Sequence, residues 1–351
     1  MTSGTLFRKE ITAIKGYHLD EQKGIKLNQN ESPWDIPVHL KAAVVEELLK
    51  TPWNRYPLGD VTRLKKKGAK YLKVWPDNLV LANGSNVLIQ AILIAAGIGR
   101  KILVFDPTFS IYELQAEMLG ARVVRVPLEE DFSIPLEKTL KTIKAEQPAI
   151  IFIANPNAPT GNLFNPDSLK KIIEHAPGLV VVDEAYFPFS GVTVIDGIKQ
   201  NEHLVVLRTF SKAFSAAGLR LGLLVADPEI AREVQKCLLP FCMNRFTFAA
   251  ASVIFEHADY VDDLCKKIVA ERKRVCEEMK KISKITVHPS DSNYILFESP
   301  KPEELFRRLL DSEVVIRQIT DGRRFQFGLR VTIGNPQEND AFLAALKKWA
   351  R

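Results

Sequence analysis

Short apolar runs separated by helix-like stretches dominate the first two thirds of the chain. Most of these runs are continuously apolar and do not alternate with polar residues, which is typical of strands covered on both faces. The predicted strands are residues 79–82, 102–105, 122–126, 150–154, 179–183, 204–208 and 221–226. Helical spacing occupies several of the intervals, at residues 86–97, 109–119 and 166–175. This alternation predicts an α/β unit built on a seven-stranded, mostly parallel sheet.

The pattern changes after Pro240. A long, charge-rich helix is expected over residues 248–282, and the mixture of strands and helices beyond it predicts a smaller α+β unit. Those later elements are strands at 293–298, 314–319 and 328–333 and helices at 302–311 and 339–351. The first 35 or so residues have no clear strand or helix and are expected to form an arm that packs on another part of the protein. We therefore expect an arm at residues 1–31 that belongs with the smaller unit, a large unit at 32–240 and a small unit at 241–351.

Composition excludes two classes of protein. With 351 residues, 46% hydrophobic and 26% charged, the chain is too apolar to be intrinsically disordered, and its length favours two domains. The longest apolar runs, residues 91–98 and 149–154, are far shorter than the ~20 residues that span a bilayer. Residues 1–15 lack the apolar core of a signal peptide. We expect no membrane association.

Net charge and cysteine content limit the kinds of ligand and partner that the chain is expected to bind. Lys and Arg exceed Asp and Glu by 48 to 42, a net charge of +6 that suits an anionic ligand. The one tight basic run, residues 65–67, fits a solvated surface better than a phosphate or nucleic-acid patch, so no nucleic-acid partner is expected. The four cysteines have no CxxC spacing and no His at ligand spacing, which predicts neither a zinc site nor a disulfide framework. A reducing, cytoplasmic compartment follows.

Lys212 lies among small and apolar residues just after a buried-looking strand. Desolvation lowers the pKa of a lysine and makes its amine nucleophilic, as Schiff-base chemistry requires. Ser211 and Arg220 flank it, and a hydroxyl with a guanidinium suits a phosphate. Taken alone, this pattern fits an ordinary surface lysine better.

Three further stretches lie at positions where ligands bind in α/β sheets. Asp183 ends an apolar strand, where a carboxylate holds a cationic ring nitrogen, caps a helix or binds a metal. Asn157, in Asn155-Pro-Asn-Ala-Pro-Thr-Gly161, either donates to a ligand oxygen or belongs to a plain turn. Gly84 and Ser85 precede a helix whose free N–H groups favour an anion, although many helices start this way.

Together the four stretches resemble the pyridoxal-phosphate-dependent aminotransferases of fold type I, over nearly the whole chain. Their order is a small-residue turn, an Asn loop, an Asp at a strand end, and Lys with Arg eight residues later. The resemblance implies that Lys212 carries pyridoxal 5′-phosphate and moves the proton at the substrate Cα. It implies that Asp183 keeps the cofactor's ring nitrogen protonated, so that the ring acts as electron sink. Asn157 and Tyr186 would hold the ring's phenolic oxygen.

The same resemblance assigns the rest of the cofactor site. Phe109 would stack on the ring face, at a position where family members often have Tyr. Arg330, in Gly328-Leu-Arg-Val-Thr-Ile-Gly334, matches the arginine that clamps a substrate carboxylate, although alone it fits a surface strand arginine. The residues implied around the cofactor phosphate are Gly84, Ser85, Asn86, Ser211 and Arg220, and Thr209 is implied as a further cofactor-binding residue.

Within the fold, the chain is similar to the histidinol-phosphate aminotransferases. Residues 26–33 (Lys-Leu-Asn-Gln-Asn-Glu-Ser-Pro) and Arg55-Tyr-Pro57 carry this finer resemblance. It implies that Tyr56 reaches the cofactor phosphate of the neighbouring subunit in a homodimer. It also implies that Tyr17 and Arg317 bind the substrate phosphate. Because histidinol phosphate has no carboxylate, Arg330 would meet its phosphate, and the carboxylate of glutamate in the other half-reaction.

The implied reaction moves the amino group of L-histidinol phosphate to 2-oxoglutarate through pyridoxamine phosphate, in histidine biosynthesis. An aromatic or broad-specificity aminotransferase remains open, and so does threonine-phosphate decarboxylase, which shares the Lys, Asp, Asn and Tyr set. A pyridoxal-dependent transcription regulator would need a winged-helix domain, and the residues before Leu27 are too few for one. No metal is expected.

Overall fold

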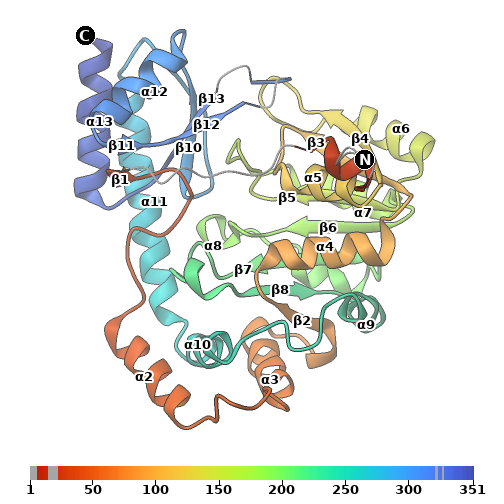
Figure 1. Cartoon of the computed structure of the whole chain (residues 1–351). Coiled ribbons are helices and arrows are strands. Elements are labelled where there is room, and N and C mark those ends of the chain that lie inside the picture. Colours follow the sequence, from red (N-terminus) through yellow and green to blue (C-terminus); the bar gives the residue numbers. More distant parts are fainter. Residues whose placement is uncertain (1–5, 15–22, 321–322, 326–327) are drawn as a thin grey trace.

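The computed structural model describes residues 6–14, 23–320, 323–325 and 328–351 (Figure 1). All seven predicted strands form, in one sheet of order β2-β8-β7-β6-β5-β3-β4. Neighbouring strands are parallel except where β8 lies antiparallel to β2 and β7. The predicted seven-stranded, mostly parallel sheet is confirmed. The strands are β2 (Leu79–Ala82), β3 (Lys101–Asp106), β4 (Arg122–Pro127), β5 (Ile150–Ala154), β6 (Leu179–Asp183), β7 (Leu204–Thr209) and β8 (Gly222–Val225).

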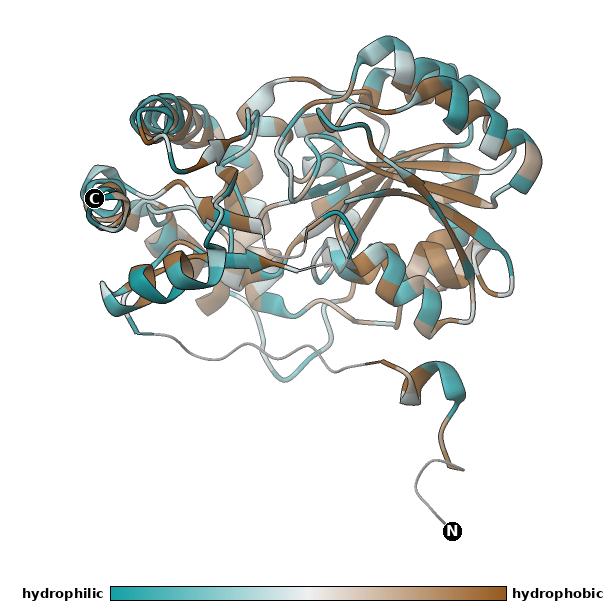
Figure 2. Ribbon diagram, turned by 90° about the horizontal axis from the view of Figure 1, so that it is seen from above, coloured by the Kyte–Doolittle hydropathy of each residue, from teal (hydrophilic) through white to brown (hydrophobic). Residues whose placement is uncertain are grey.

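Helices cover both faces of this sheet, which explains the continuous apolar sequence of its strands (Figure 2). In β5, Ile151 and Ile153 belong to the apolar cluster on one face, whereas Ile150, Phe152 and Ala154 belong to the cluster on the other. Because successive side chains of a strand point to opposite faces, both sets must be apolar. The helices and turns around the sheet are α4 (Ser85–Ala96), α5 (Ile111–Met118), α6 (Leu136–Glu146), α7 (Pro166–His175), α8 (Phe187–Ser190), η3 (Ile195–Lys199), η4 (Ala217–Leu219) and α9 (Pro228–Lys236).

Three helices pack together beside β2, at the lower end of the molecule in Figure 1. They are α2 (Val38–Leu49), α3 (Asp60–Leu72) and α10 (Arg245–Glu256), and the turn η2 (Pro76–Asn78) joins α3 to β2. The predicted division of the chain at residue 240 stays a prediction. Because α10 packs on α2 and α3, the packing favours a division nearer residue 258.

The single helix predicted over residues 248–282 is wrong, because the structure has two helices there. The chain leaves the helical conformation at His257, where φ is −130°, and α11 (Asp259–Lys280) starts after Ala258. Asp259 and Asp262 stand in the first turn of α11, where carboxylates interact favourably with the helix dipole. No helix in the described part of the chain, α11 included, is long and apolar enough to cross a membrane.

The C-terminal part contains an antiparallel sheet of order β12-β13-β10-β9. The strand predicted over residues 314–319 is divided between two sheets, because its first two residues pair elsewhere as β11. The elements of this part are β9 (Thr286–Val287), β10 (Tyr294–Glu298), α12 (Pro302–Asp311), β11 (Val314–Val315), β12 (Arg317–Ile319), β13 (Gly328–Thr332) and α13 (Pro336–Ala350).

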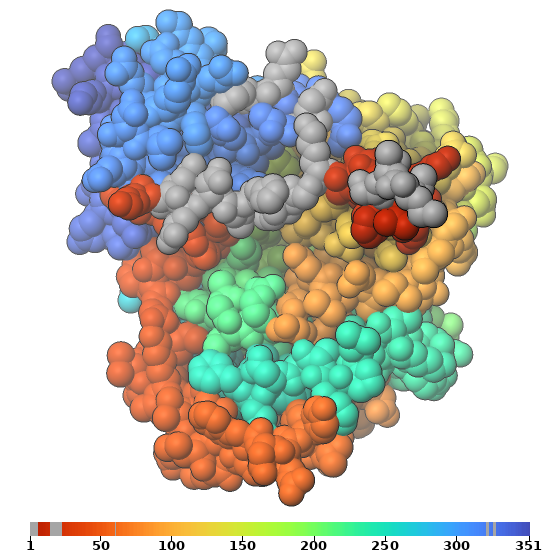
Figure 3. All heavy atoms as spheres, in the orientation of Figure 1, coloured from red at the N-terminus to blue at the C-terminus, as the bar shows by residue number. Residues whose placement is uncertain are grey.

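The expectation that the first 35 residues lack regular elements is wrong in two places. The short helix α1 (Lys9–Thr12) contacts α5, on the right of the surface shown in Figure 3. The strand β1 (Ile25–Lys26) pairs in parallel with β11. A strand of two residues has no periodicity that a sequence pattern reveals. The pairing fixes the segment that follows β1 against the C-terminal part of the chain.

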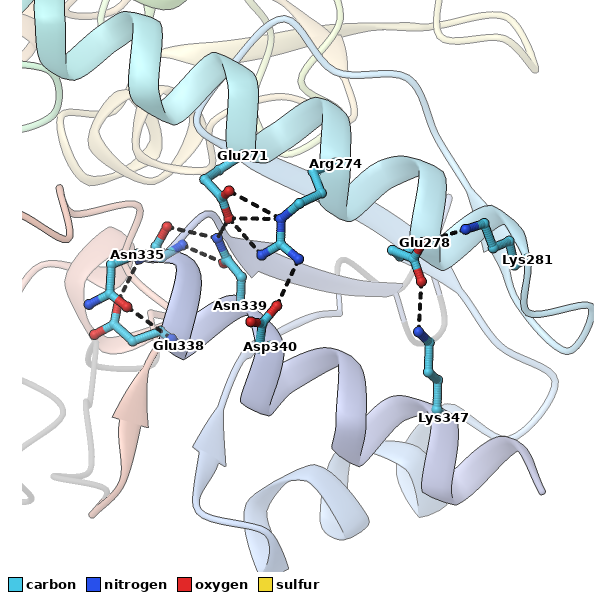
Figure 4. A network of polar contacts seen from close by, with 10 residues as sticks. Glu271, Arg274, Glu278, Lys281, Asn335, Glu338, Asn339, Asp340 and Lys347 are labelled. Atoms are coloured by element: carbon cyan, nitrogen blue, oxygen red, sulfur yellow. Dashed lines mark hydrogen bonds and ion pairs between the residues drawn. The ribbon is translucent and has the colours of Figure 1, made fainter.

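Polar contacts hold α13 against α11 (Figure 4). Arg274 of α11 bonds to Glu271 on its own helix and to Asp340 of α13, the latter at 2.7 Å. Asn339 Nδ2 donates to the same Glu271 carboxylate at 2.8 Å. These bonds fix the helix that follows β13 against α11.

Candidate active site

The carboxyl ends of the parallel strands meet at one edge of the sheet, and the predicted site residues follow them. Asp183 ends β6, and Lys212 comes three residues after β7. β2 has the same direction as β7, since both are antiparallel to β8, and this brings Gly84 to the same edge. A cavity of about 440 Å³ opens there. The predicted residues that line it are Ser85, Asn86, Phe109, Asp183, Tyr186, Thr209, Ser211, Lys212 and Arg220.

The Lys212 amine is largely shielded from solvent and donates to the Gln29 carbonyl oxygen at 2.8 Å. Burial lowers the pKa of Lys212 to about 8, and the positive charge of Arg330 acts in the same direction. At pH 8 about half of this amine is then neutral, against about 0.3% for a lysine of ordinary pKa. A neutral amine is the nucleophile that a covalent link to an aldehyde requires.

The Asp183 carboxylate is almost fully buried and accepts two hydrogen bonds. The Tyr112 hydroxyl donates to Oδ2 at 2.8 Å, and the Ala185 N–H donates to Oδ1 at 3.1 Å. Burial outweighs both bonds and raises the pKa of Asp183 to about 6. Sequence reasoning missed Tyr112, whose signal is its place three residues after Phe109 in the segment that follows β3. A cationic ligand atom beside Asp183 would stabilise its ionised form.

An anion site is built where α4 begins. Gly84 has a φ of 92°, and a Cβ at this position would lie 2.6 Å from Nη2 of Arg220. A Cβ on Gly222 would lie 2.3 Å from the backbone nitrogen of Ser85. Arg220 Nη1 donates to the Ser211 hydroxyl at 3.3 Å. The hydrogen-bond donors at this point are the N-terminus of α4, hydroxyl groups and a guanidinium. This set of donors is suitable for binding a phosphate.

The Asn157 side chain bonds within its own part of the molecule and does not line the cavity. Its Nδ2 donates to the Pro107 carbonyl at 3.0 Å and to Thr160 Oγ1 at 2.8 Å, and its Oδ1 accepts from Thr108 at 2.9 Å. Both amide hydrogens are in use. A bond from Asn157 to a cofactor oxygen therefore requires the exchange of one of these partners, and the predicted role stays a prediction.

The Tyr186 hydroxyl accepts a hydrogen bond of 2.8 Å from Nδ2 of Asn30, a residue that sequence reasoning did not single out. Burial raises the pKa of Tyr186, so its phenol stays neutral near pH 7. The signal for Asn30 is the motif at residues 26–33, in which it lies, but no pattern within that motif names its partner.

A second cleft, of about 750 Å³, shares Lys212 and Tyr186 with the first cavity and contains the predicted arginines. Arg317 on β12 and Arg330 on β13 occupy directly opposite positions, so their side chains are on one face of the small sheet. Arg330 Nη2 donates to the Asn28 carbonyl at 3.0 Å.

Arg323 is a third arginine in this cleft, and sequence reasoning missed it. Its Nε lies 2.8 Å from Oδ2 of Asp106, at the end of β3, and Nη2 lies 3.1 Å from Oε2 of Glu113 on α5. These ion pairs join the segment between β12 and β13 to the seven-stranded unit across the cleft. Three arginines, Arg317, Arg323 and Arg330, therefore line the side of the cleft formed by β12, β13 and the segment between them.

A family model described as "Aminotransferase class I and II" matches residues 22–346. The chain belongs to this family. It is 39% identical over 346 residues to "Histidinol-phosphate aminotransferase 2" of Nitrosococcus oceani, covering 97% of this chain and 96% of the relative. It is 38% identical over 324 residues to "Histidinol-phosphate aminotransferase" of Deinococcus radiodurans, covering 92% and 90%. The solved histidinol-phosphate aminotransferase of Clostridium acetobutylicum matches with a TM-score of 0.86 at 28% identity, covering 92% and 98%.

Membership confirms the predicted fold type I and the predicted class of enzyme, an aminotransferase that uses pyridoxal 5′-phosphate. The residues of this aminotransferase fit that cofactor. Gly84 and Gly222 leave room where a Cβ would collide with Arg220 or Ser85, so the phosphate cradle is formed by backbone and guanidinium. The same cavity contains a buried amine at Lys212 and a buried carboxyl. These are the groups that an aldehyde and a ring nitrogen require.

Tyr56 does not line the cavity or the cleft of its own chain. Tyr56 is 70% exposed, and its ring stacks on Phe241 with centroids 4.4 Å apart. Its predicted contact belongs to a neighbouring subunit and stays a prediction. Tyr17 lies outside the described residues. In the described part of the chain, no group of three or more His, Cys, Asp and Glu side chains is arranged to hold a metal ion.

Proposed function

We propose that this aminotransferase transfers the amino group of L-histidinol phosphate to 2-oxoglutarate, as a step of histidine biosynthesis. The observation that carries the proposal is the pair Arg317 and Arg330, directly opposite each other in a cleft that continues into the Lys212 cavity. Two guanidinium groups on one face of a sheet provide a favourable binding site for an anion such as a phosphate. An amino donor with a phosphate at its far end supplies that anion, and the names of the similar proteins point to the same donor.

Pyridoxal phosphate, when bound, supplies an electron sink for the electrons released at the substrate Cα. The α4 N-terminus, Ser211 and Arg220 would bind its phosphate, and Asp183 would keep a proton on its ring nitrogen by charge pairing. Phe109, which lines the cavity, would cover one face of the ring and exclude water from it. Tyr186 would hold the ring's phenolic oxygen, and Asn157 would join it after exchanging one of its present hydrogen-bond partners.

Lys212 would hold the cofactor through its amine, and the same amine would take the proton from the substrate Cα. Its lowered pKa suits both tasks, because a base must be neutral to accept a proton. Arg330 and Arg317 orient the substrate by binding its phosphate, together with Tyr17. In the second half-reaction Arg330 binds the carboxylate of the acceptor. Bidentate pairing with a guanidinium fixes the orientation of the substrate in both half-reactions.

We further propose a homodimer in the cytoplasm in which Tyr56 completes the phosphate site of the neighbouring subunit. Its exposure supports this, as does the exposed apolar surface around it, formed by Trp53, Leu58, Phe241 and Phe246. Exposed aromatic surface of this kind is typical of protein interfaces. Co-expression of Tyr56→Ala chains with Lys212→Ala chains tests it. A mixed dimer then retains one intact site, and activity confined to the mixed species is expected.

The substrate proposal is tested by the absorbance of the holoenzyme mixed with histidinol phosphate alone. The visible cofactor band should fall as the amino group is transferred, and 2-oxoglutarate should restore it. Histidinol without phosphate should act far more weakly, and Arg317→Gln should abolish this preference. Arg324→Gln, on an exposed residue of the same segment outside the cleft, is the matched control. An unmoved band contradicts the proposed donor, an equal response to aromatic amino acids indicates a broad-specificity enzyme, and CO₂ release from threonine phosphate indicates a decarboxylase.

A further inference from the structure

Asn30 is a buried polar residue at which three distant parts of the chain meet. It is 1% exposed. Its backbone carbonyl accepts from Asn293 Nδ2 at 3.0 Å, and its side chain bonds to Thr332 on β13 and to Tyr186 after β6. Its φ of 55° is in the left-handed region, which Asn tolerates better than most residues. Asn30 is therefore held in place from three sides.

The direction of each hydrogen bond in this cluster follows from which atoms can donate. The Asn30 backbone N–H can only donate, and it lies 2.9 Å from Thr332 Oγ1. The Thr332 hydroxyl accepts there, and it donates its own hydrogen to Asn30 Oδ1 at 3.2 Å. In this arrangement the oxygen end of the Asn30 amide faces Thr332. The other end, Nδ2, faces Tyr186 and donates to its hydroxyl.

These bonds restrict the direction in which the Tyr186 hydroxyl can point its one hydrogen. Because its oxygen accepts from Asn30, that hydrogen must point elsewhere, and Tyr186 lines the Lys212 cavity. Within the described part of the chain, Asn30 is the one hydrogen-bond partner of this hydroxyl. The nearby hydroxyl of Tyr294 does not compete, since it bonds to the Asn157 carbonyl at 2.6 Å.

We propose that Thr332 and Asn30 are positioning residues that turn Tyr186 into a fixed hydrogen-bond donor toward the cavity, where it favours an anionic ring oxygen of the bound cofactor. The inference rests on cofactor binding and not on the identity of the amino donor. An asparagine is needed because it accepts at one end and donates at the other. An aspartate would accept from both neighbours and draw the Tyr186 hydrogen away from the cavity.

Charged and titratable groups face Tyr186 from several elements. Arg330 lowers the pKa of Tyr186 and Asp183 raises it, and Tyr112, Tyr294 and Lys212 line the same region. None of these groups bonds to the Asn30 amide, so variants at Asn30 and Thr332 change the direction of the donor and leave them in place. A titration of the cofactor's own absorbance then reports on the donor.

The experiment is a pH titration of the visible absorbance of the holoenzyme without substrate. Asn30→Asp should raise the apparent pKa of the bound cofactor by about one unit, the size of one hydrogen bond to a charged oxygen, and Tyr186→Phe should raise it similarly. Thr332→Val leaves the amide free to turn and should raise this pKa by a smaller amount, without adding charge. Thr332→Ser keeps the hydroxyl and should titrate as the unchanged protein does.

Asn293→Ala is the matched control for a merely structural role. It removes a hydrogen bond to the Asn30 backbone and should lower the melting temperature while leaving the cofactor pKa unchanged. The proposal is overturned if Tyr186→Phe shifts the cofactor pKa while Asn30→Asp and Thr332→Val do not. It is also overturned if Asn293→Ala shifts the cofactor pKa as much as those two variants do. If Asn30→Asp does not fold, the proposal is tested by comparing the cofactor pKa of Thr332→Val with that of Thr332→Ser. Failure of histidinol phosphate as donor leaves this result standing, so the two proposals fail separately.

Discussion

Replacing Tyr112 by Phe tests whether Asp183 is a buried carboxylate that ionises near pH 6. The change removes the hydroxyl that donates to Asp183 at 2.8 Å. It keeps the ring, which stacks on Phe152 with centroids 4.8 Å apart. Both residues are fully buried, so the volume of the core is nearly preserved. The loss of stability then reports on the hydrogen bond.

The expected loss depends on pH in a defined direction. Burial raises the pKa of Asp183 to about 6, so this carboxyl is mostly protonated at pH 5 and mostly ionised at pH 8. In the unfolded chain an aspartate ionises near pH 4, so the native cofactor-free protein loses stability as pH rises through about 4 to 6. The Tyr112 hydroxyl offsets part of that loss, by about 2 kcal/mol when its partner is charged and about 1 kcal/mol when it is neutral.

These energies convert to melting temperatures through the entropy of unfolding, roughly 0.7 kcal/mol/K for a chain of this length. Tyr112→Phe should therefore lower the Tm of the cofactor-free protein by about 3 °C at pH 8 and about 1 °C at pH 5, measured by calorimetry. Tyr260→Phe is the control, because that hydroxyl donates to the neutral Phe214 carbonyl at 3.0 Å and its loss should not depend on pH. An equal loss for Tyr112→Phe at both pH values refutes the reasoning.

Three further changes test other parts of the site. Lys212→Ala should lower kcat by about 10²-fold or more, because positioned proton transfer contributes about 10²–10⁴-fold, and normal turnover in a steady-state assay would contradict the mechanism. Arg317→Ala should raise the KM of the phosphorylated donor far more than that of glutamate, and equal losses for both substrates speak against its assignment to the phosphate. Gly222→Ala introduces a Cβ 2.3 Å from the backbone nitrogen of Ser85, and the overpacking should weaken pyridoxal-phosphate binding by about tenfold in a fluorescence titration. An unchanged affinity would mean that the cradle can shift.

The large sheet could be predicted from the sequence because its strands are buried on both faces. β5 and β6 were predicted with the bounds that the structure has, since a continuous apolar run has one simple explanation. The elements that were missed carry no such signal. β1 has two residues, and its partner β11 lies almost 300 residues away. The break at His257 interrupts a sequence whose apolar spacing continues on both sides.

The site was predictable for a topological reason. Parallel strands bring their carboxyl ends to one edge, so Asp183 and Lys212 had to come close once β6 and β7 were recognised. Their hydrogen-bond partners follow no such rule. Tyr112, Asn30 and Gln29 reach the site through side-chain and loop geometry, from segments separated by 71 to 183 residues from the groups they contact. The sequence therefore indicates the reacting groups, and the tertiary structure supplies the partners that set their pKa values and directions.

The proposed anion specificity of the cleft depends on strand register more than on net charge. A surplus of six positive charges spread over 351 residues does not locate a binding site. The pairing of β12 with β13 does, because it sets Arg317 opposite Arg330, and like charges at such positions destabilise a sheet. The fold moderates this repulsion with the Asn28 carbonyl at 3.0 Å from Arg330 and with the face of Tyr294, whose ring centroid lies 5.1 Å from the same guanidinium. A slip of one residue in this register would move one arginine to the other face and separate the pair. Under the proposed function, the short strands β12 and β13 would thus determine which substrates the site can orient.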